Sequence, residues 1–182
     1  MSAGSRLDVA TPSPTEIVVT RGFAAPRARV FDALTVPDLV MRWYGARGWR
    51  VVECDVDLRP GGAWRFVSSG PGEQRMVQSG TYLEVRRPHR LVHTEAFDGS
   101  TDEPALVTIV LTERAGQTIL RMTVRYPRAE ARDAVLETRM ASGLREAYDR
   151  LAEVLSGPGG AGPDPAPTPE GSTRPDRPRQ TR

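Results

Sequence analysis

The sequence contains no lysine and a single cysteine, Cys54. One cysteine excludes an intramolecular disulfide and a zinc site built from cysteine ligands. No stretch approaches the ~20 consecutive apolar residues that a membrane-spanning helix needs. Residues 1–14 are rich in Ser, Ala and Pro and lack an apolar run, so they do not resemble a secretory signal. We therefore expect a cytoplasmic protein with no membrane partner.

An excess of charge of one sign is also absent, because 25 arginines are nearly balanced by 23 acidic residues. The arginines are scattered, and no recognition helix or set of stacking aromatics accompanies them, so we expect no nucleic-acid partner. Without lysine the chain cannot contain a phosphate-binding Gly-x-x-x-x-Gly-Lys loop. The two histidines, His89 and His93, have no carboxylate cluster beside them and predict no metal site. We expect no cofactor.

The 182 residues are enough for one domain of ordinary size. Residues 156–182 are dense in Pro and Gly and have almost no apolar side chains beyond Ala. Such a segment cannot bury enough apolar surface to offset its chain entropy, so it is predicted to be a disordered tail. Residues 1–14 are predicted to be flexible as well. The folded domain is therefore expected to span residues 15–155.

Hydrophobic periodicity predicts the order of strands and helices within this domain. Pro26 suits the first position of a short helix, Pro37 ends that helix, and a second short helix covers about residues 37–43. Strands are predicted at about residues 16–23, 49–58, 75–85, 90–97, 105–113 and 118–126, together with the segment that contains Trp64 and Phe66. A long amphipathic helix is predicted over about residues 129–155. This order indicates an α+β fold with about seven strands.

The apolar positions of these elements predict how they pack. Between residues 49 and 58, Val52, Cys54, Val56 and Leu58 alternate with acidic residues, as in a half-buried antiparallel strand. The last helix carries a wide apolar stripe that includes Leu136, Met140, Leu144, Ala147, Tyr148, Leu151 and Leu155. Only this helix is large enough to cover the sheet. A curved sheet wrapped around one helix leaves a gap, and we expect a ligand cavity there.

Aromatic, methionine and leucine side chains on these inner faces are the candidates to line that cavity. They are Trp43, Trp64, Phe66, Tyr82, Met122, Met140, Leu144 and Tyr148, together with His93. Plain core packing explains each of them singly as well as ligand contact does. His93 shares a strand face with Leu91, Glu95 and Phe97. It is a candidate catalytic residue, as a base near neutral pH, and a hydrogen-bonded core histidine is the alternative.

Four segments, in order, resemble the activator-of-heat-shock-ATPase homology family of the START/SRPBCC (birch-pollen-allergen-like) superfamily. They are residues 33–45 (ALTVPDLVMRWYG), 57–66 (DLRPGGAWRF), 80–94 (GTYLEVRRPHRLVHT) and 143–151 (GLREAYDRL). The resemblance covers about residues 15–155. It implies a helix-grip fold, in which a curved antiparallel sheet wraps around a long C-terminal helix. Leu144 stands where the family usually has Trp, which implies a cavity of different shape.

The resemblance implies a fold more firmly than a function, so three functions stay open. The first is binding of a small, mostly apolar molecule of the polyketide, lipid or aromatic-metabolite type. The second is a cyclase or dehydratase with His93, Glu95 or Tyr82 as proton-transfer groups, although no nucleophile–base–orienter trio is evident. The third is a co-chaperone-like interaction domain, which would need an exposed apolar patch. Exposed edge strands would also permit a homodimer.

Overall fold

The computed structural model describes residues 6–100, 103–138 and 140–157. Most of the predicted disordered tail, residues 158–182, lies outside the described residues. The strands are β1 (Asp8–Ser13), β2 (Glu16–Phe23), β3 (Arg50–Val56), β4 (Ala63–Ser69), β5 (Arg75–Arg86), β6 (Arg90–Phe97), β7 (Ala105–Arg114) and β8 (Gln117–Arg125). The helices are α1 (Arg27–Thr35), α2 (Pro37–Trp43), a short 3-10 turn (Pro71–Glu73), α3 (Ala129–Glu137) and α4 (Met140–Ser156).

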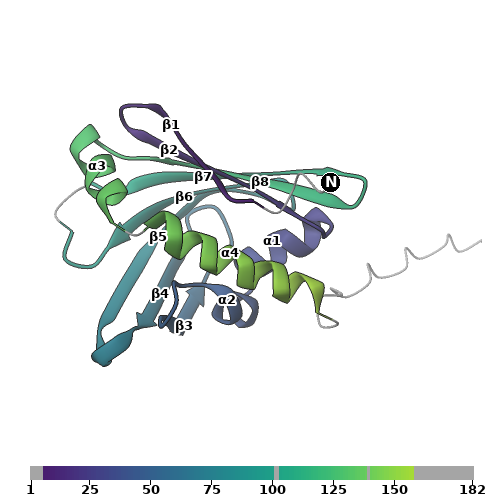
Figure 1. Cartoon of the computed structure of the whole chain (residues 1–182), viewed down its shortest axis with the longest axis horizontal. Helices are drawn as coiled ribbons and strands as arrows, with labels where there is room; N and C mark the ends of the chain where they lie inside the picture. The colour runs from purple at the N-terminus through teal and green to yellow at the C-terminus, as the bar shows by residue number, and fades with distance from the viewer. Residues whose placement is uncertain (1–5, 101–102, 139, 158–182) are drawn as a thin grey trace, which may run out of the picture.

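All eight strands form one antiparallel sheet in the order β1-β2-β8-β7-β6-β5-β4-β3. After β2 the chain crosses through α1 and α2 to the far edge of the sheet and returns strand by strand until β8 pairs with β2. The return uses tight turns, such as Ala115–Gly116 with both residues at positive φ between β7 and β8. The sheet curves around α4, which lies across its inner face (Figure 1).

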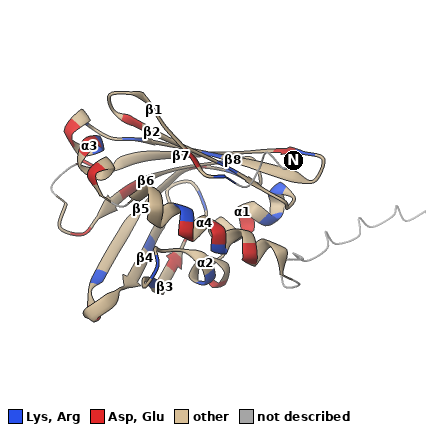
Figure 2. Ribbon diagram, viewed as in Figure 1, with Lys and Arg blue, Asp and Glu red and all other residues tan. Residues whose placement is uncertain are grey.

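Helix α4 carries its apolar side chains at the helical spacing that the sequence predicts. Ala147, Tyr148, Leu151 and Leu155 are buried, and charges of both signs follow one another along the helix (Figure 2). The α4 backbone runs closest to the helices α1, α2 and α3. It reaches the strands through long side chains, among them Tyr148, whose ring centroid lies 5.9 Å from that of Phe23 on β2.

The first strand, β1, was not predicted from the sequence. It pairs antiparallel with β2, with Asp8 opposite Thr20 and Ser13 opposite Glu16. The prediction of a flexible N-terminus is therefore wrong for residues 8–13, and the sheet has eight strands where about seven were expected. Most side chains of β1 are exposed, so the strand is held mainly by backbone hydrogen bonds and leaves little apolar alternation to detect.

The long C-terminal helix is also interrupted, and the single helix predicted over residues 129–155 is wrong at this point. Thr138 has an extended backbone with ψ of 174°. Its hydroxyl donates to the Val135 carbonyl at 2.6 Å and accepts from the Met140 amide at 3.1 Å. One hydroxyl thus ends α3 and caps the first turn of α4. Leu136, expected on the apolar stripe, is 39% exposed on α3.

A β-bulge changes the phase of β3. The pairing of β3 with β4 shifts between Val51 and Glu53. Val51 is consequently buried and Val52 exposed, which corrects the predicted inward position of Val52. Beyond the bulge, Cys54 and Val56 return to the inner face and pack against the core as predicted. The sequence alternation could not reveal the extra residue, because a bulge is a property of the strand pair.

Candidate ligand site between the sheet and helix α4

Aromatic side chains form a continuous row through the interior. Neighbouring ring centroids along this row are 4.9 to 5.9 Å apart, mostly in edge-to-face or tilted pairs. The row joins β2, α4, α2 and β4 to β6 and β5 through Phe23, Tyr148, Trp43, Tyr44, Phe66, Trp64, His93 and Tyr82. The structure therefore brings six of the nine predicted site residues into one cluster.

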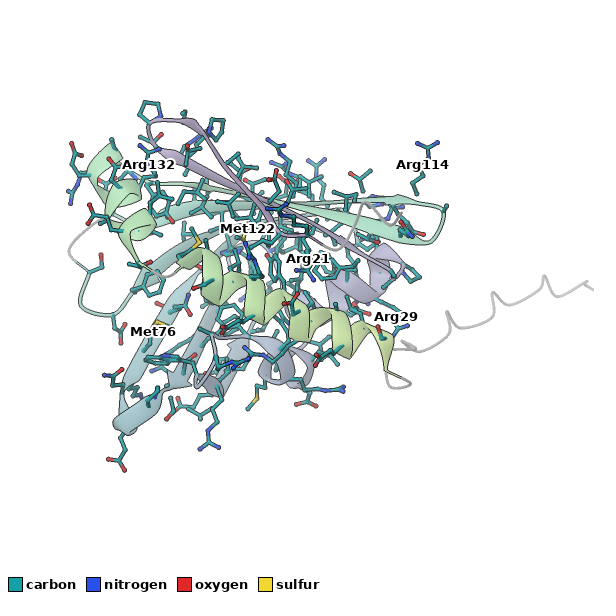
Figure 3. All side chains as sticks on the ribbon, viewed as in Figure 1. Arg21, Arg29, Met76, Arg114, Met122 and Arg132 are labelled. Atoms are coloured by element: carbon teal, nitrogen blue, oxygen red, sulfur yellow. The ribbon has the colours of Figure 1, made fainter. Side chains whose placement is uncertain are left out.

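The remaining three predicted residues, Met122, Met140 and Leu144, are partly buried against the same core. Figure 3 shows Met122 of β8 between the sheet and α4, and its sulfur lies 3.9 Å from the Tyr148 hydroxyl. Met140 and Leu144 belong to the first turns of α4. These three side chains face the interior yet keep accessible surface.

The two tryptophans of the row are structural anchors. Trp43 and Trp64 are buried, and each indole N–H donates to a backbone carbonyl, Trp43 to Ala33 at 2.8 Å and Trp64 to Thr94 at 3.2 Å. Their polar atoms are thereby satisfied, as buried indoles require. Core packing accounts for both residues, and any ligand would meet only part of their ring faces.

His93 of β6 is buried with its ring edge-on to Trp64. Its Nδ1 lies 3.2 Å from the Thr94 carbonyl oxygen. Burial disfavours the charged imidazolium and lowers the pKa of His93 to about 4, although the hydrogen bond to Thr94 acts in the opposite direction. His93 is therefore neutral near pH 7. Burial therefore weakens its basicity, which counts against the role of general base that the sequence suggested for it.

Glu95 lies two residues further along the same inner face of β6, opposite Ala105 of β7. Burial raises the pKa of its carboxyl to about 7, and burial is the single cause of that shift. Among the described residues, Glu95 has no hydrogen bond and no ion pair. Its shared face with His93 is visible in the sequence, but its lack of a partner is not.

Two further polar side chains on the inner face were missed in the sequence analysis. Gln78 of β5 is 6% exposed and donates from Nε2 to the Tyr44 hydroxyl at 2.9 Å. Ser68 of β4 is 0% exposed. Gln78 Oε1 and Ser68 Oγ have no hydrogen-bond partner in the described part of the chain.

Arg21 is the buried cation of the inner face, and sequence reasoning missed it too. It lies between Val19 and Phe23 on β2 and points toward α4 (Figure 3). Its guanidinium pairs with Asp149 of α4 at 2.7 Å, with the Arg21 side chain 6% exposed and that of Asp149 57% exposed. The pair links sheet and helix, so Arg21 is neutralised by Asp149 rather than by Glu95.

Other kinds of site find no support in the described residues. Within residues 6–100, 103–138 and 140–157, no group of three His, Cys, Asp or Glu side chains is placed to hold a metal ion. The described helices include none that is both long and apolar enough to cross a bilayer. Burial raises the pKa of the Cys54 thiol to about 11, so it is not an activated nucleophile.

A curved antiparallel sheet closed around one C-terminal helix, with two short helices after the strand β2, defines the helix-grip class of proteins. Within that class, residues 24–156 match the family described as activator of Hsp90 ATPase homolog 1-like protein. This protein belongs to that family. The fold class and the family that the sequence motifs predict are both confirmed.

Several solved structures have a fold similar to that of this protein. A Rhodobacter sphaeroides protein is 38% identical with a TM-score of 0.77, over 82% of this chain and 97% of its own. A Nitrosomonas europaea protein is 25% identical with a TM-score of 0.72, over 80% and 96%. A Mycobacterium smegmatis protein, similar in fold, is 23% identical with a TM-score of 0.76, over 83% and 98%. No curated protein matches the sequence.

Proposed function

We propose that this protein binds a small, mostly apolar ligand of the polyketide, lipid or aromatic-metabolite type, in the cytoplasm, between the inner face of the sheet and α4. Membership of the family supports the proposal, because proteins of this family commonly bind hydrophobic ligands. The proposed lining consists of Trp43, Trp64, Phe66, Tyr82, His93, Met122, Met140, Leu144 and Tyr148.

The proposal rests on the partial burial of four side chains that face the interior. Met122, Met140, Leu144 and Tyr44 point into the core cluster, yet they are only partly buried. Side chains in a closely packed core are normally excluded from solvent. Accessible surface on such residues is what we expect where the space between helix and sheet admits a small molecule.

Filling that space tests the proposal. Leu144→Trp would add an indole at a half-buried position of α4, whereas Leu136→Trp adds the same group at an exposed position of α3. Binding of the neutral dye Nile red to each full-length variant is followed by its fluorescence. We expect Leu144→Trp to weaken dye binding by about tenfold or more, through loss of ~1.4 kcal/mol or more of contact energy. Leu136→Trp should bind like the parent.

Two results would contradict the proposal. One is a folded parent protein that does not enhance Nile red emission at any protein concentration. The other is equal dye affinity in the Leu144→Trp and Leu136→Trp variants. Circular dichroism of both variants confirms that they keep the helix-grip fold, so loss of binding through unfolding is recognised directly.

One observation favours acid–base catalysis in the same space as a second candidate function. The pKa of Glu95 is about 7, and a general base is most effective when its pKa lies near the working pH. Tyr82 and His93 adjoin at 5.9 Å between ring centroids. In a cyclase or dehydratase reaction, Glu95 would accept the substrate proton. Turnover that survives in Glu95→Gln on a substrate found by extract screening would refute this role.

A further inference from the structure

The interior between the sheet and α4 is closed at one end of the helix and open at the other. Leu151 and Leu155, toward the C-terminal end of α4, are 0% and 5% exposed. Met140 and Leu144, in its first turns, pack against the same core but are only partly buried. Exposure of the inner side chains therefore increases toward the N-terminal end of α4.

The strands that face α4 show the same gradient. On the side of α1, Phe23 of β2 and Leu120 of β8 are 3% and 0% exposed. At the opposite end, Tyr126 directly after β8 is half-buried, and Phe97, the last residue of β6, is 42% exposed. Because both layers lose burial at the same end, a small molecule would enter the interior there. We call this open end the mouth, and its residues are Phe97, Tyr126, Met140 and Leu144.

Helix α3 stands at the mouth, between the end of β8 and the first turn of α4 (Figure 1). None of the side chains of its nine described residues is buried. Val135 packs partly against the core, whereas Leu136 is 39% exposed. A helix this short has little stability of its own. With so little apolar burial, α3 should detach at a lower free energy than α4 does.

The backbone is extended on both sides of α3. Arg128 before the helix has φ of −152° and ψ of 162°, and Thr138 after it has ψ of 174°. The Tyr126 amide donates to the Thr15 carbonyl at 2.9 Å, which fixes the chain just before the first of these joints. Residues at the ends of an element are where hinge rotations are absorbed. Helix α3 can therefore turn as one body while β8 and α4 stay in place.

Arg132 ties α3 to the sheet. Its Nη1 donates to the carbonyl of Ser13, the last residue of β1, at 3.3 Å, and its Nε lies 2.7 Å from the carboxylate of Asp133 in the same helix. Figure 3 shows Arg132 close to the β1–β2 hairpin. Among the described residues, no other side chain of α3 forms a hydrogen bond to a strand. One hydrogen bond thus holds the helix in its place at the mouth.

We propose that α3 is a lid over the mouth, hinged at Arg128 and Thr138 and latched by the hydrogen bond from Arg132 to Ser13. This inference rests on the proposed function. The structure shows the latched state, and the ligand enters and leaves when the latch is released. Since Val135 is the side chain that α3 contributes to the core, the lid controls the rates of entry and release more than the affinity.

Removing the latch tests the proposal. Arg132→Met keeps an apolar side chain of similar length and removes the donor. Stopped-flow fluorescence follows the association of Nile red with the full-length protein, and its release into an excess of phosphatidylcholine vesicles. A weaker latch raises the population of the open state, so we expect both rate constants to rise about three- to tenfold. The equilibrium affinity should change by less than about twofold, because passage is faster in both directions.

Arg29→Met is the matched control. Arg29 Nη2 donates to the Gly157 carbonyl at 3.3 Å, so this variant loses a hydrogen bond of the same kind and length at the closed end of α4. Both rate constants should stay at the parental values. Circular dichroism checks that both variants are folded.

Hydrogen exchange of the protein without dye provides a second readout. Peptides that cover residues 129–137 should exchange severalfold faster in Arg132→Met than in the parent. Peptides that cover residues 140–156 should exchange at the same rate in both proteins.

The outcomes separate the lid from the proposed function. Unchanged rate constants or unchanged exchange of α3 in Arg132→Met overturns the lid while dye binding stands. Equal acceleration in Arg29→Met also overturns it. Faster release with a matching loss of affinity would make α3 part of the binding surface, which again overturns the lid. A parent protein that does not bind Nile red contradicts the proposed function itself, and the lid is overturned with it.

Discussion

Glu95→Gln should make the stability of this protein respond differently to pH. The substitution keeps the size of the side chain, replaces one carboxyl oxygen with an NH2 group and removes the titration. In the parent, burial raises the folded-state pKa of Glu95 from 4.5 to about 7. The folded protein therefore keeps its proton at pH values where the unfolded chain has already released it. The stability that the protonated carboxyl provides is fully present below about pH 4.5 and is lost as pH rises through about 7.

The magnitude follows from the two pKa values. They differ by about 2.5, and each pKa unit corresponds to ~1.4 kcal/mol. Ionisation of Glu95 should thus lower the free energy of unfolding by at most about 3–4 kcal/mol. The carboxyl keeps some accessible surface, and partial solvation makes about 2 kcal/mol the more realistic loss. A loss of this size is large against the ~5–15 kcal/mol by which domains are stable.

Urea denaturation of both proteins at several pH values measures the effect. The free energy of unfolding is extrapolated from the tryptophan fluorescence transition, and the difference between variant and parent is plotted against pH. That difference should grow in favour of Glu95→Gln between about pH 5 and about pH 8. Taking the difference cancels all other titrating groups. Glu153→Gln, changed in the same way at an exposed site, should give a flat plot.

A flat plot for Glu95→Gln would refute the reasoning, because it would mean that the Glu95 carboxyl has the same pKa in the folded and unfolded chains. A slope of the opposite sign would show that an unrecognised cation stabilises the carboxylate.

Further perturbations probe the same interior. The folded-state pKa of His93 is lowered to about 4, so the free energy of unfolding of the parent should fall by about 2–3 kcal/mol as pH falls from 6.5 toward about 4. His93→Gln should abolish that loss, and acid titration followed by circular dichroism measures it. Asp149→Asn should lower the free energy of unfolding in urea by about 1–2 kcal/mol, because the buried Arg21 loses its carboxylate while the exposure of Asp149 limits the effect. Gly80→Ala should cost more than about 3 kcal/mol in thermal unfolding, because the new Cβ would lie 1.8 Å from the Thr94 oxygen.

Each of these three expectations has a result that would contradict it. Parallel acid titrations of parent and His93→Gln would mean that the imidazole is not shielded from solvent. Unchanged stability in Asp149→Asn would mean that the ion pair contributes nothing. Gly157→Ala, whose Cβ would meet its nearest neighbour, the Val154 oxygen, at 3.6 Å, is the control for Gly80→Ala, and equal costs at both positions would show that the backbone near Thr94 moves freely.

Burial shifts the pKa values of Glu95 and His93 in opposite directions. Burial raises the pKa of the acid and lowers that of the base, so both side chains are held toward their neutral forms. As pH falls from about 7 to about 4, the first group adds stability and the second removes it. The parent protein should therefore show a shallow pH dependence in this window, and single variants should reveal the two contributions separately.

Several elements of the fold could be predicted from local sequence. The β-branched run of β2, the helix-ending Pro37 and the apolar stripe around Leu151 each act within a few residues, through backbone sterics and side-chain periodicity. These signals predicted the order of elements, and the four motifs predicted the family. The strand β1 and the break at Thr138 escaped prediction, because one depends on backbone pairing and the other on the hydrogen bonds of a single hydroxyl.

Some residues of the candidate site could likewise be predicted from the sequence, and others could not. Aromatic residues such as Trp64 and Tyr148 were predictable, because large apolar side chains on amphipathic elements must enter the core. Gln78 and Ser68 share strand parity with the predicted residues Tyr82 and Phe66, but the sequence did not show that each would have a polar atom without a partner among the described residues. Burial is the single cause that shifts the pKa of Glu95, and the buried Arg21 pairs with Asp149. Periodicity is a local property of the chain, whereas the presence or absence of a countercharge depends on residues more than a hundred positions apart, which only the folded structure brings together.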